Sequence, residues 1–275
     1  MHGFLLGSDP EIFLKDKSGK LISSIGKIGG TKKQPRITNH GSVQEDNVLL
    51  EFNSKPSATV EEFIENHKLV MDDITTIIKP LDLSVSVQPT GVFDDDQLDH
   101  AKAKAAGCEP DFNAWSLSIN NPPDLGATNL RSGAGHIHIS LDYLDSARNR
   151  AEAIRRANVV KACDIAAALP SVVMDPDSTR RSLYGKAGCH RPKFMGAKDP
   201  FNGIEYRTLS NFWLRSDETL RWAFEAIKMG LERTEEFMYY LEDGALDGAE
   251  IQRIINESDV EAAQSYCADL NLLVA

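Results

Sequence analysis

The stretch Gly133-Ala-Gly-His-Ile-His-Ile-Ser140 alternates polar and apolar residues with the period of a β-strand. In an extended chain His136, His138 and Ser140 lie on one face, and the two isoleucines between them lie on the other. We therefore expect a strand that buries its apolar face in a core and presents a row of polar groups on the opposite face.

Three further stretches repeat this pattern of polar residues two positions apart. They carry Asp9 and Glu11, then Glu45, Asn47 and Glu51, and finally Glu205 and Arg207. Parity along a straight strand puts Asp46 on the apolar side with Val48, so Glu45 ranks above Asp46 unless a bulge shifts the strand. One such pair is typical of a solvated strand face, but four polar faces in one chain indicate a shared polar sheet surface.

Helical periodicity separates these strands. Apolar residues recur at helical spacing from Thr59 to Pro80, with Thr59-x-x-Glu62 as a capping box, and again over 146–169 and from 216 to the end. Irregular interleaving of strands and helices favours an α+β fold: a mainly antiparallel, curved sheet with helices packed on one face. We expect residues 1–215 to form the catalytic domain. The helices of residues 216–275 pack on the same domain or mediate self-association.

Composition excludes several classes of protein. The 275 residues contain 30 Lys plus Arg against 41 Asp plus Glu, a net charge of −11, which disfavours general binding to nucleic acids or anionic membranes. No signal-peptide core is present, and no apolar segment suggests a membrane span. The four cysteines are scattered, as expected for reduced thiols in a cytoplasm. No glycine-rich dinucleotide motif or P-loop occurs.

Electrostatics predicts what the polar sheet surface binds. Two carboxylates about 4 Å apart repel by roughly 4 kcal/mol at an effective dielectric constant near 20. Several converging carboxylates therefore need protonation or a divalent cation. A site rich in carboxylates with one imidazole suits Mg²⁺ or Mn²⁺ better than Zn²⁺.

A second feature is basic. The segment Arg180–Lys193 contains no acid, in a protein that is acidic overall, and its basic residues are Arg180, Arg181, Lys186, Arg191 and Lys193. Guanidinium groups suit phosphate or carboxylate oxygens, although a solvated basic loop is an equally good interpretation of this segment alone. Beside a metal site, such a loop points to phosphoryl transfer from a metal-bound nucleotide.

The order of these motifs resembles the glutamine synthetase superfamily, and most closely the compact carboxylate–amine (COOH·NH₂) ligases of tailed bacteriophages. Gly7–Leu14 is similar to the family's opening G-x-E-x-E-F-F strand, Gly133–Ser140 to its G-S-G-x-H-x-H-x-S strand, and Gly203–Arg207 to its R-x-E-x-R strand. Here Asp9 is shorter than the family's Glu, and Gly203 replaces its first Arg. The large N-terminal domain of true glutamine synthetases has no counterpart.

The resemblance implies a glutamine-synthetase-like catalytic domain and a set of site residues. The metal ligands would be Asp9, Glu11, Glu51, His136 and Glu205, with Glu45 added by parity. The residues binding ATP would be His138, Ser140, Arg180, Arg181, Lys186, Arg191 and Arg207. Arg191, Glu205 and Arg207 would be catalytic.

The implied activity is an ATP-dependent ligase that forms an amide or peptide-like bond through an acyl phosphate and releases ADP and phosphate. Its partners would be ATP, Mg²⁺ or Mn²⁺, a small-molecule or peptide carboxylate, and an amine. Its location would be the cytoplasm, that of a bacterial host if the chain is of phage origin.

Two other functions stay open from the residues alone. A metal-dependent hydrolase could use the His-x-His pair and the carboxylates to activate water. A non-catalytic protein could retain ATP without turning it over. A cupin-like oxygenase is disfavoured because the long helices do not suit an all-β fold. The segment 107–115 mixes acidic and aromatic groups and is interpreted as either a wall of the substrate pocket or a structural turn.

Overall fold

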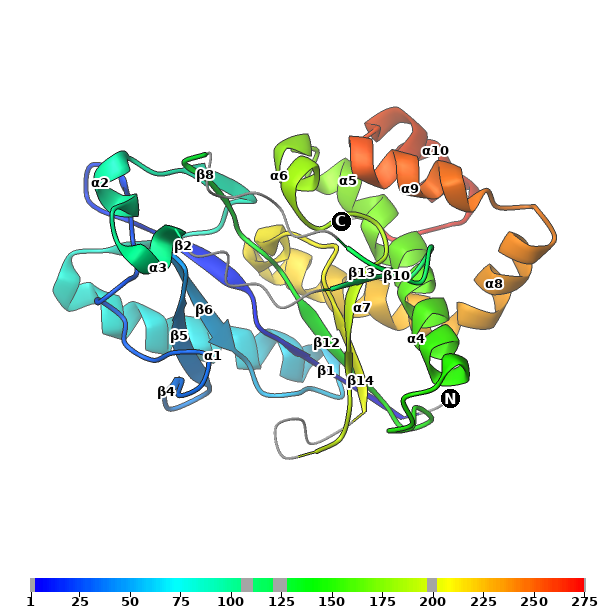
Figure 1. Cartoon of the computed structure of the whole chain (residues 1–275), viewed down its shortest axis with the longest axis horizontal. Coiled ribbons are helices and arrows are strands. Elements are labelled where there is room, and N and C mark those ends of the chain that lie inside the picture. Colours follow the sequence, from blue (N-terminus) through cyan, green and yellow to red (C-terminus); the bar gives the residue numbers. More distant parts are fainter. Residues whose placement is uncertain (1–2, 105–110, 121–127, 197–201, 275) are drawn as a thin grey trace.

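The stretch with alternating histidines forms the second strand of an antiparallel sheet in the computed structural model, which describes residues 3–104, 111–120, 128–196 and 202–274 (Figure 1). The strands of this first sheet follow the spatial order β1 (Phe4–Ser8), β12 (Ile137–Leu141), β14 (Gly203–Tyr206), β13 (Cys189–Lys193), β9 (Phe112–Asn113) and β10 (Ser118–Ile119). The register places His138 opposite both Gly7 and Glu205, so the polar faces of β12 and β14 coincide.

A second antiparallel sheet continues from the first. Its order is β3 (Leu21–Ile22), β2 (Glu11–Lys15), β6 (Leu49–Asn53), β5 (Ser42–Asp46) and β4 (Arg36–Ile37), and β7 (Ser84–Ser86) also pairs with β2. A separate ribbon is made by β8 (Thr90–Val92) and β11 (Leu130–Ser132).

The link Asp9–Pro10 joins the two sheets. β1 pairs with β12 of the first sheet, whereas β2, which begins at Glu11, pairs with β6 of the second. Backbone N–H groups of Asp9 and Glu11 donate to the carbonyls of His136 and Ala134, so the chain stays attached to the first sheet as it enters the second. The sequence Asp-Pro-Glu therefore puts one acidic residue at each side of the junction.

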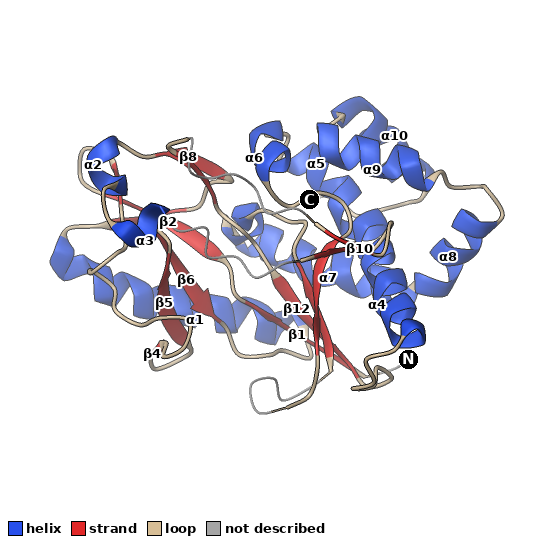
Figure 2. Ribbon diagram, viewed as in Figure 1, coloured by secondary structure: helices blue, strands red, loops and turns tan. Residues whose placement is uncertain are grey.

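Helices cover the apolar face of both sheets. α1 (Val60–Ile78) and α7 (Asp217–Glu232) lie behind the sheets in the view of Figure 2. In the core, Ile137 and Ile139 pack with residues of α4 (Arg150–Cys163) and α7. Ile12 and Leu50 of the second sheet pack with α1. The predicted α+β class, with a curled antiparallel sheet and helices, is confirmed.

Local signals explain the boundaries of α1. Thr59 is the N-cap, and its Oγ1 accepts a hydrogen bond of 3.2 Å from the Glu62 backbone N–H. Glu62 accepts from the N–H of Ala58 instead of Thr59, so only half of the expected capping box forms. Pro80 lies in the 3₁₀ turn Lys79–Leu81 that ends the helix.

The helix that follows β12 is longer than expected. α4 continues through a π-helical turn (Asp164–Ala168) into α5 (Leu169–Met174). This 25-residue helix is long and apolar enough to span a membrane by length and composition alone, so the expectation that no segment reaches that length is wrong. Because 78% of its most apolar window is buried inside the protein, it also fits the role of a core helix.

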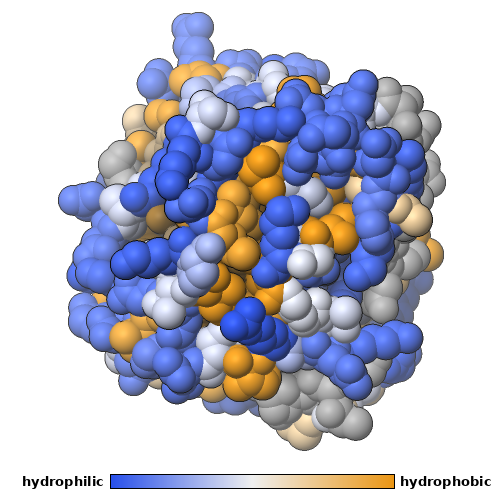
Figure 3. All heavy atoms as spheres, turned by 90° about the vertical axis from the view of Figure 1, so that its left-hand side faces the viewer, coloured by the Kyte–Doolittle hydropathy of each residue, from blue (hydrophilic) through white to orange (hydrophobic). Residues whose placement is uncertain are grey.

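The region 170–200, expected to be irregular, holds regular elements as well. Besides α5 it contains α6 (Ser178–Leu183) and β13, which tolerates Pro192 within the strand. The two short helices α2 (Asp95–Leu98) and α3 (Ala101–Lys104) lie over the other face of the second sheet, where Phe13 packs near Phe93. The end of the expected helix Asp94–Ala106 falls outside the described residues. On this side of the molecule hydrophilic residues surround a smaller apolar area (Figure 3).

The chain ends in helices that pack beside α5 and α6. They are α8 (Thr234–Glu242), α9 (Gly248–Glu257) and α10 (Val260–Asp269), after the 3₁₀ turn Asn211–Leu214 and α7. Their apolar residues share a core cluster with α5, including Phe237, Ile254 and Val172. Cys163, Cys189 and Cys267 are free and buried, and Cys108 lies outside the described residues.

Candidate active site

Three side chains of metal-ligating type meet where β12 and β14 pair beside the Asp9–Pro10 link. They are Asp9, His138 and Glu205, and one ligand atom from each lies within 4.8 Å of the others. The register explains this arrangement. His138 on β12 and Glu205 on β14 are direct cross-strand partners, and Asp9 directly follows β1, which pairs with the other edge of β12. His138 Nε2 lies 3.1 Å from Asp9 Oδ1. We refer to these residues as the first cluster.

A second cluster forms on the second sheet from Glu11, Asp46 and Glu51, again with ligand atoms within 4.8 Å of one another. Glu11 and Glu51 are cross-strand partners on β2 and β6. Gln44, opposite Glu51 on β5, donates a hydrogen bond of 2.8 Å from Nε2 to Glu51 Oε1. The two clusters adjoin, since Asp9 and Glu11 are only two residues apart on the chain that links the sheets.

The parity prediction for Glu45 is wrong. The chain does not run straight from Glu45 to Glu51 but reverses at Asn47 and Val48, with Asn47 at a positive φ of 53°. In the resulting hairpin Gln44 faces Glu51, and Asp46, two residues on, shares their face. Glu45 instead accepts hydrogen bonds from the N–H groups of Gly26 and Gly29, outside the cluster.

Several buried atoms of the site lack regular hydrogen bonds, which fits a bound cation. Asp9 Oδ1 and His138 Nε2 face each other at 3.1 Å without a hydrogen bond of regular geometry, and His136 Nε2 makes no hydrogen bond within the described part of the chain. His136 Nδ1 lies 3.5 Å from Asp9 Oδ1 and 3.8 Å from Glu205 Oε1, so His136 borders the first cluster. A buried polar atom without a partner is costly, and carboxylates with imidazoles are suitable donors for Mg²⁺ or Mn²⁺.

The raised pKa values of carboxyls in the second cluster also indicate a site for a cation. Burial, with the negative charge of Asp46, raises the pKa of Glu11 to about 8. Burial and the charge of Asp9 raise the pKa of Glu51 well above its usual value. Without a cation Glu11 is therefore mostly protonated at pH 7, and the adjacent negative charges disfavour ionisation of Glu51 as well. A divalent cation would remove the repulsion and displace the protons.

In the first cluster the pKa values of Asp9 and His136 are lowered rather than raised. Burial disfavours the charge of Asp9, but the charge of His138 and contacts with both histidines outweigh it and lower the Asp9 pKa well below the usual value. Burial and the charge of Arg207 lower the pKa of His136 to about 4, so this imidazole is neutral at pH 7. A neutral imidazole is the form that can bind a metal ion.

Cationic side chains converge on Glu205. Arg191 Nη1 lies 3.3 Å from Glu205 Oε1, and Lys193 Nζ lies 3.3 Å from Oε2. Arg207 Nη1 also donates to Oε1, and Arg207 Nε lies 3.3 Å from Asp111 Oδ2. The guanidinium of Arg207 is thus held from two sides, with its carbon 5.2 Å from the centre of the Tyr184 ring.

Arg180 approaches from α6. It is buried, and its Nη1 donates a hydrogen bond of 2.7 Å to the carbonyl of Thr208, next to Arg207. Burial and the neighbouring charge of Arg181 lower the Arg180 pKa to about 10, which leaves it a cation at pH 7. The charge of Arg180 also acts on Glu11, so this end of the basic segment lies near the second cluster.

The other residues predicted to bind ATP are placed differently. Arg181 is buried but donates to the Asp175 carbonyl and to Ser258 Oγ, which ties α6 to the C-terminal helices. Lys186 is exposed. Ser140 shares the face of His138 and lies opposite Gly203. A Cβ atom at position 203 would come within 2.0 Å of the Ile139 carbonyl oxygen, so the arginine of the family motif has no room here.

Sequence patterns missed several residues of the site. Asp46 was ranked below Glu45 because the hairpin turn was not foreseen. Asp111 belongs to the acidic and aromatic segment 107–115, but only the pairing of β9 with β13 brings it to Arg207. Lys193 was part of the basic segment and received no role. Its position two residues after Arg191, on the same strand face, was an available signal.

A buried carboxylate behind the site was also missed. Asp164, in the π-helical turn, is fully buried and accepts four hydrogen bonds. Its donors are Trp115 Nε1 (2.7 Å), Gly188 N (2.6 Å), Tyr206 Oη (2.8 Å) and Thr208 Oγ1 (3.1 Å). Asp164 thereby joins the basic segment to the end of β14, from which Glu205 and Arg207 project.

Comparison with known proteins identifies structural neighbours only. No protein-family model matches the sequence, and no curated protein matches it. Among solved structures, the chain is similar to a novel glutamine synthase homolog (TM-score 0.42, 12% identity, covering 97% of this chain and 67% of that one). It is also similar to GmaS without ligand, with a TM-score of 0.46 and 11% identity, covering 100% of this chain and 70% of that one. A third similar structure is a bifunctional glutathione synthetase from Pasteurella multocida, with a TM-score of 0.47 and 11% identity, covering 98% of this chain and 47% of that one. A likeness at this level does not extend to substrates or mechanism.

Proposed function

We propose that this protein is an ATP-dependent carboxylate–amine ligase. The observation that carries the proposal is the meeting of two adjoining carboxylate clusters with Arg191, Lys193 and Arg207 at one polar sheet surface. Metal-ligating carboxylates beside converging cations are the parts that phosphoryl transfer from a metal-bound nucleotide requires.

Divalent cations have suitable residues in both clusters. Asp9, His138 and Glu205, with His136 beside them, would hold one Mg²⁺ or Mn²⁺, and Glu11, Asp46 and Glu51 would hold another. When bound, such cations neutralise phosphate oxygens and make the phosphorus easier to attack.

The chain's own cations act on the transferred group. Arg207 and Arg191 are forked donors that suit phosphate oxygens, and Lys193 adds a third positive charge. All three now contact Glu205, and a phosphate would share them with it. Asp111 accepts from Arg207 Nε, which positions the guanidinium beside Glu205.

The proposed reaction has two balanced steps. A carboxylate oxygen of the acid attacks the γ-phosphorus of ATP, the bond to the β-phosphate oxygen breaks, and ADP leaves with the electron pair. The amine nitrogen then attacks the carbonyl carbon of the acyl phosphate, inorganic phosphate leaves, and the nitrogen loses a proton. Activation is needed because a free carboxylate is a poor electrophile, and the split into two steps lowers each barrier.

A phosphate-release assay tests the proposal. The purified protein is mixed with ATP, Mg²⁺ and pools of carboxylic acids, amino acids, polyamines and small peptides, and ADP, phosphate and new amides are measured. We expect release that requires both an acid and an amine. Glu205→Gln should lower turnover at least a hundredfold, and Glu45→Gln, outside the clusters, should leave it within twofold.

Other outcomes point to the alternatives. Cleavage of an ester or amide without ATP would indicate a metal-dependent hydrolase. Phosphate release that ignores the amine would contradict the ligase reaction. ATP binding without any turnover across the pools would indicate a protein that only retains the nucleotide.

A further inference from the structure

The segment 146–156, at the start of α4, carries a positive charge that the proposed reaction does not use. It contains four arginines (Arg148, Arg150, Arg155 and Arg156) and one acid, Glu152, in a protein whose net charge is −11. Glu152 already pairs with both Arg155 and Arg156. Arg148 and Arg150 are exposed, and neither makes an ion pair with any residue that the structure describes.

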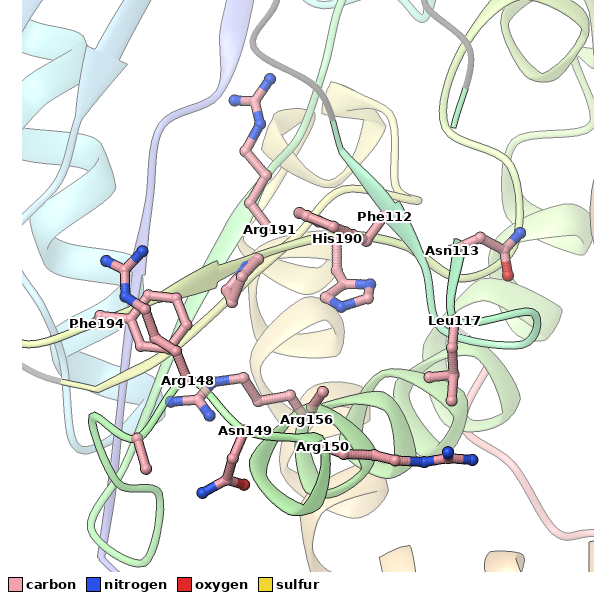
Figure 4. A pocket seen from close by; sticks show the side chains of 13 residues that line it. Phe112, Asn113, Leu117, Arg148, Asn149, Arg150, Arg156, His190, Arg191 and Phe194 are labelled. Carbon is pink, nitrogen blue, oxygen red and sulfur yellow. The ribbon is translucent and has the colours of Figure 1, made fainter. Parts of the chain in front are cut away.

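These two arginines border a cavity of about 740 Å³. The cavity lies between the beginning of α4 and the strands β9 and β13, and Figure 4 shows the side chains that surround it. Its volume falls in the range of small-molecule sites, and none of its described lining residues is acidic. The N-terminus of α4 adds a partial positive charge at the same place.

The walls of the cavity are flat and apolar. Phe112, Pro192 and Phe194 are among its lining residues, and the ring of His190 points into the space in Figure 4. The guanidinium carbons of Arg148 and Arg156 lie 4.3 Å and 4.8 Å from the centre of the Phe194 ring. Two cations near one ring repel each other. Of these two, Arg156 pairs with Glu152 and Arg148 does not, so an anion beside Arg148 would be favourable.

The cavity is separate from the carboxylate clusters. Successive residues of β13 point to opposite faces, so His190 and Pro192 face the cavity whereas Arg191 and Lys193 contact Glu205. The Arg191 guanidinium points away from the other lining side chains in Figure 4. A ligand in the cavity would therefore contact the reverse side of the strand that carries these two active-site cations.

The geometry points to a second binding site here, for a small molecule with a planar ring and an anionic group such as a phosphate or carboxylate. The ring packs against Phe112 and Pro192, and the anion pairs with Arg148, whose guanidinium lies over the Phe194 ring. The Arg150 side chain points the other way in Figure 4 and adds positive charge near the helix N-terminus. This site goes beyond the proposed ligase reaction and does not depend on it.

Calorimetric titration without ATP or divalent ions tests the site. 2-Naphthyl phosphate and 2-naphthoate are the probes, which distinguish phosphate from carboxylate, and inorganic phosphate and 2-naphthol supply the anion and the ring separately. We expect at least one probe to bind at least tenfold more tightly than either separate part. The double variant Arg148→Gln, Arg150→Gln should weaken that probe at least tenfold, and Phe194→Leu about threefold.

Matched controls keep the test independent of the active site. Arg221→Gln removes an exposed arginine on α7, and Glu205→Gln alters the first cluster; both should bind the probe within twofold of the unmodified protein. Melting temperatures confirm that each variant is folded. Absence of binding by either probe at 5 mM, equal affinity in the double arginine variant, or loss of binding in Glu205→Gln would overturn the assignment. The ATP assay fails or succeeds separately.

Discussion

At the scale of single residues, His67 shows how a buried group ties stability to pH. It lies on α1 with 1% of its surface exposed. Its Nδ1–H donates to the Phe63 carbonyl at 2.6 Å, so Nε2 is the acceptor for Ser8 Oγ at 2.7 Å. Burial lowers the pKa of His67 to about 4, and a proton on Nε2 would force the Ser8 hydroxyl to accept instead of donate.

His67 should therefore destabilise the protein in acid. Its lowered pKa gives stability that is complete above the unfolded-state pKa of 6.5 and is lost as the pH falls towards 4. The loss amounts to about 3 kcal/mol over this range. Urea unfolding at pH 7.5, 5.5 and 4.5 should show His67→Gln losing less stability than the unmodified protein. His100→Gln, at an exposed histidine, should keep the original slope, and an unchanged slope in His67→Gln would contradict the assignment.

Asp46 and Glu45 are neighbours with different expected roles. Asp46→Asn removes a charge from the second cluster and should weaken Mn²⁺ binding at least tenfold. Glu45→Gln keeps an oxygen that can accept from Gly26 and Gly29, and should leave Mn²⁺ affinity within twofold. Electron paramagnetic resonance of free Mn²⁺ measures both. The reverse order of effects would show that the ligands follow strand parity after all.

At the scale of elements, Asp164 connects its helix to three segments that are far apart in sequence. In Asp164→Asn the remaining oxygen can accept from the N–H groups of Trp115 and Gly188, and the new NH₂ group faces the hydroxyls of Tyr206 and Thr208, which must then accept instead of donate. Exchanging hydrogen bonds to a charged acceptor for weaker neutral ones should lower the free energy of unfolding by about 2 kcal/mol.

Urea unfolding at pH 7.5 measures this loss, and Trp115 fluorescence reports on the weakened hydrogen bond of its indole. Asp247→Asn is the matched control, because Asp247 is an N-cap on α9 where Asn serves equally well. A loss below 0.5 kcal/mol in Asp164→Asn would mean that the network does not hold β14 and the basic segment together.

At the scale of the whole molecule, the position of the clusters follows from one strand that changes sheets. Asp9 faces the first sheet and Glu11 the second, so both clusters assemble only when the two sheets are joined. A divalent cation that binds only the folded protein should therefore stabilise the entire fold.

Cation binding should also release protons. Because the pKa of Glu11 is about 8, this carboxyl is mostly protonated at pH 7 and must ionise to bind a metal ion. Affinity for Mn²⁺ should rise from pH 6 to pH 8, and titrations at pH 7 in buffers of different ionisation enthalpy should show proton release, to which Glu11 contributes about one proton. Millimolar Mn²⁺ should raise the melting temperature by several degrees, and EDTA should reverse it. Heats that do not depend on the buffer would contradict this linkage.

Much of the fold was predictable because its signals are local. The period of α1, its cap at Thr59 and the alternation around His138 depend on residues within a few positions of one another. The same alternation identified Asp9, Glu11, Glu51, His138 and Glu205 as polar residues on strands, all of which the structure brings into the two clusters.

Tertiary structure alone decided how those residues combine. The turn at Asn47 and Val48 brings Asp46 into the second cluster and turns Glu45 away, and the pairing of β9 with β13 brings Asp111 to Arg207. α6 directs Arg180 towards the site and Arg181 into the C-terminal helices. Sequence by itself determined which faces are polar, since side-chain alternation is a property of the extended backbone. Partners across strands depend on register and turns, which only the packed chain fixes.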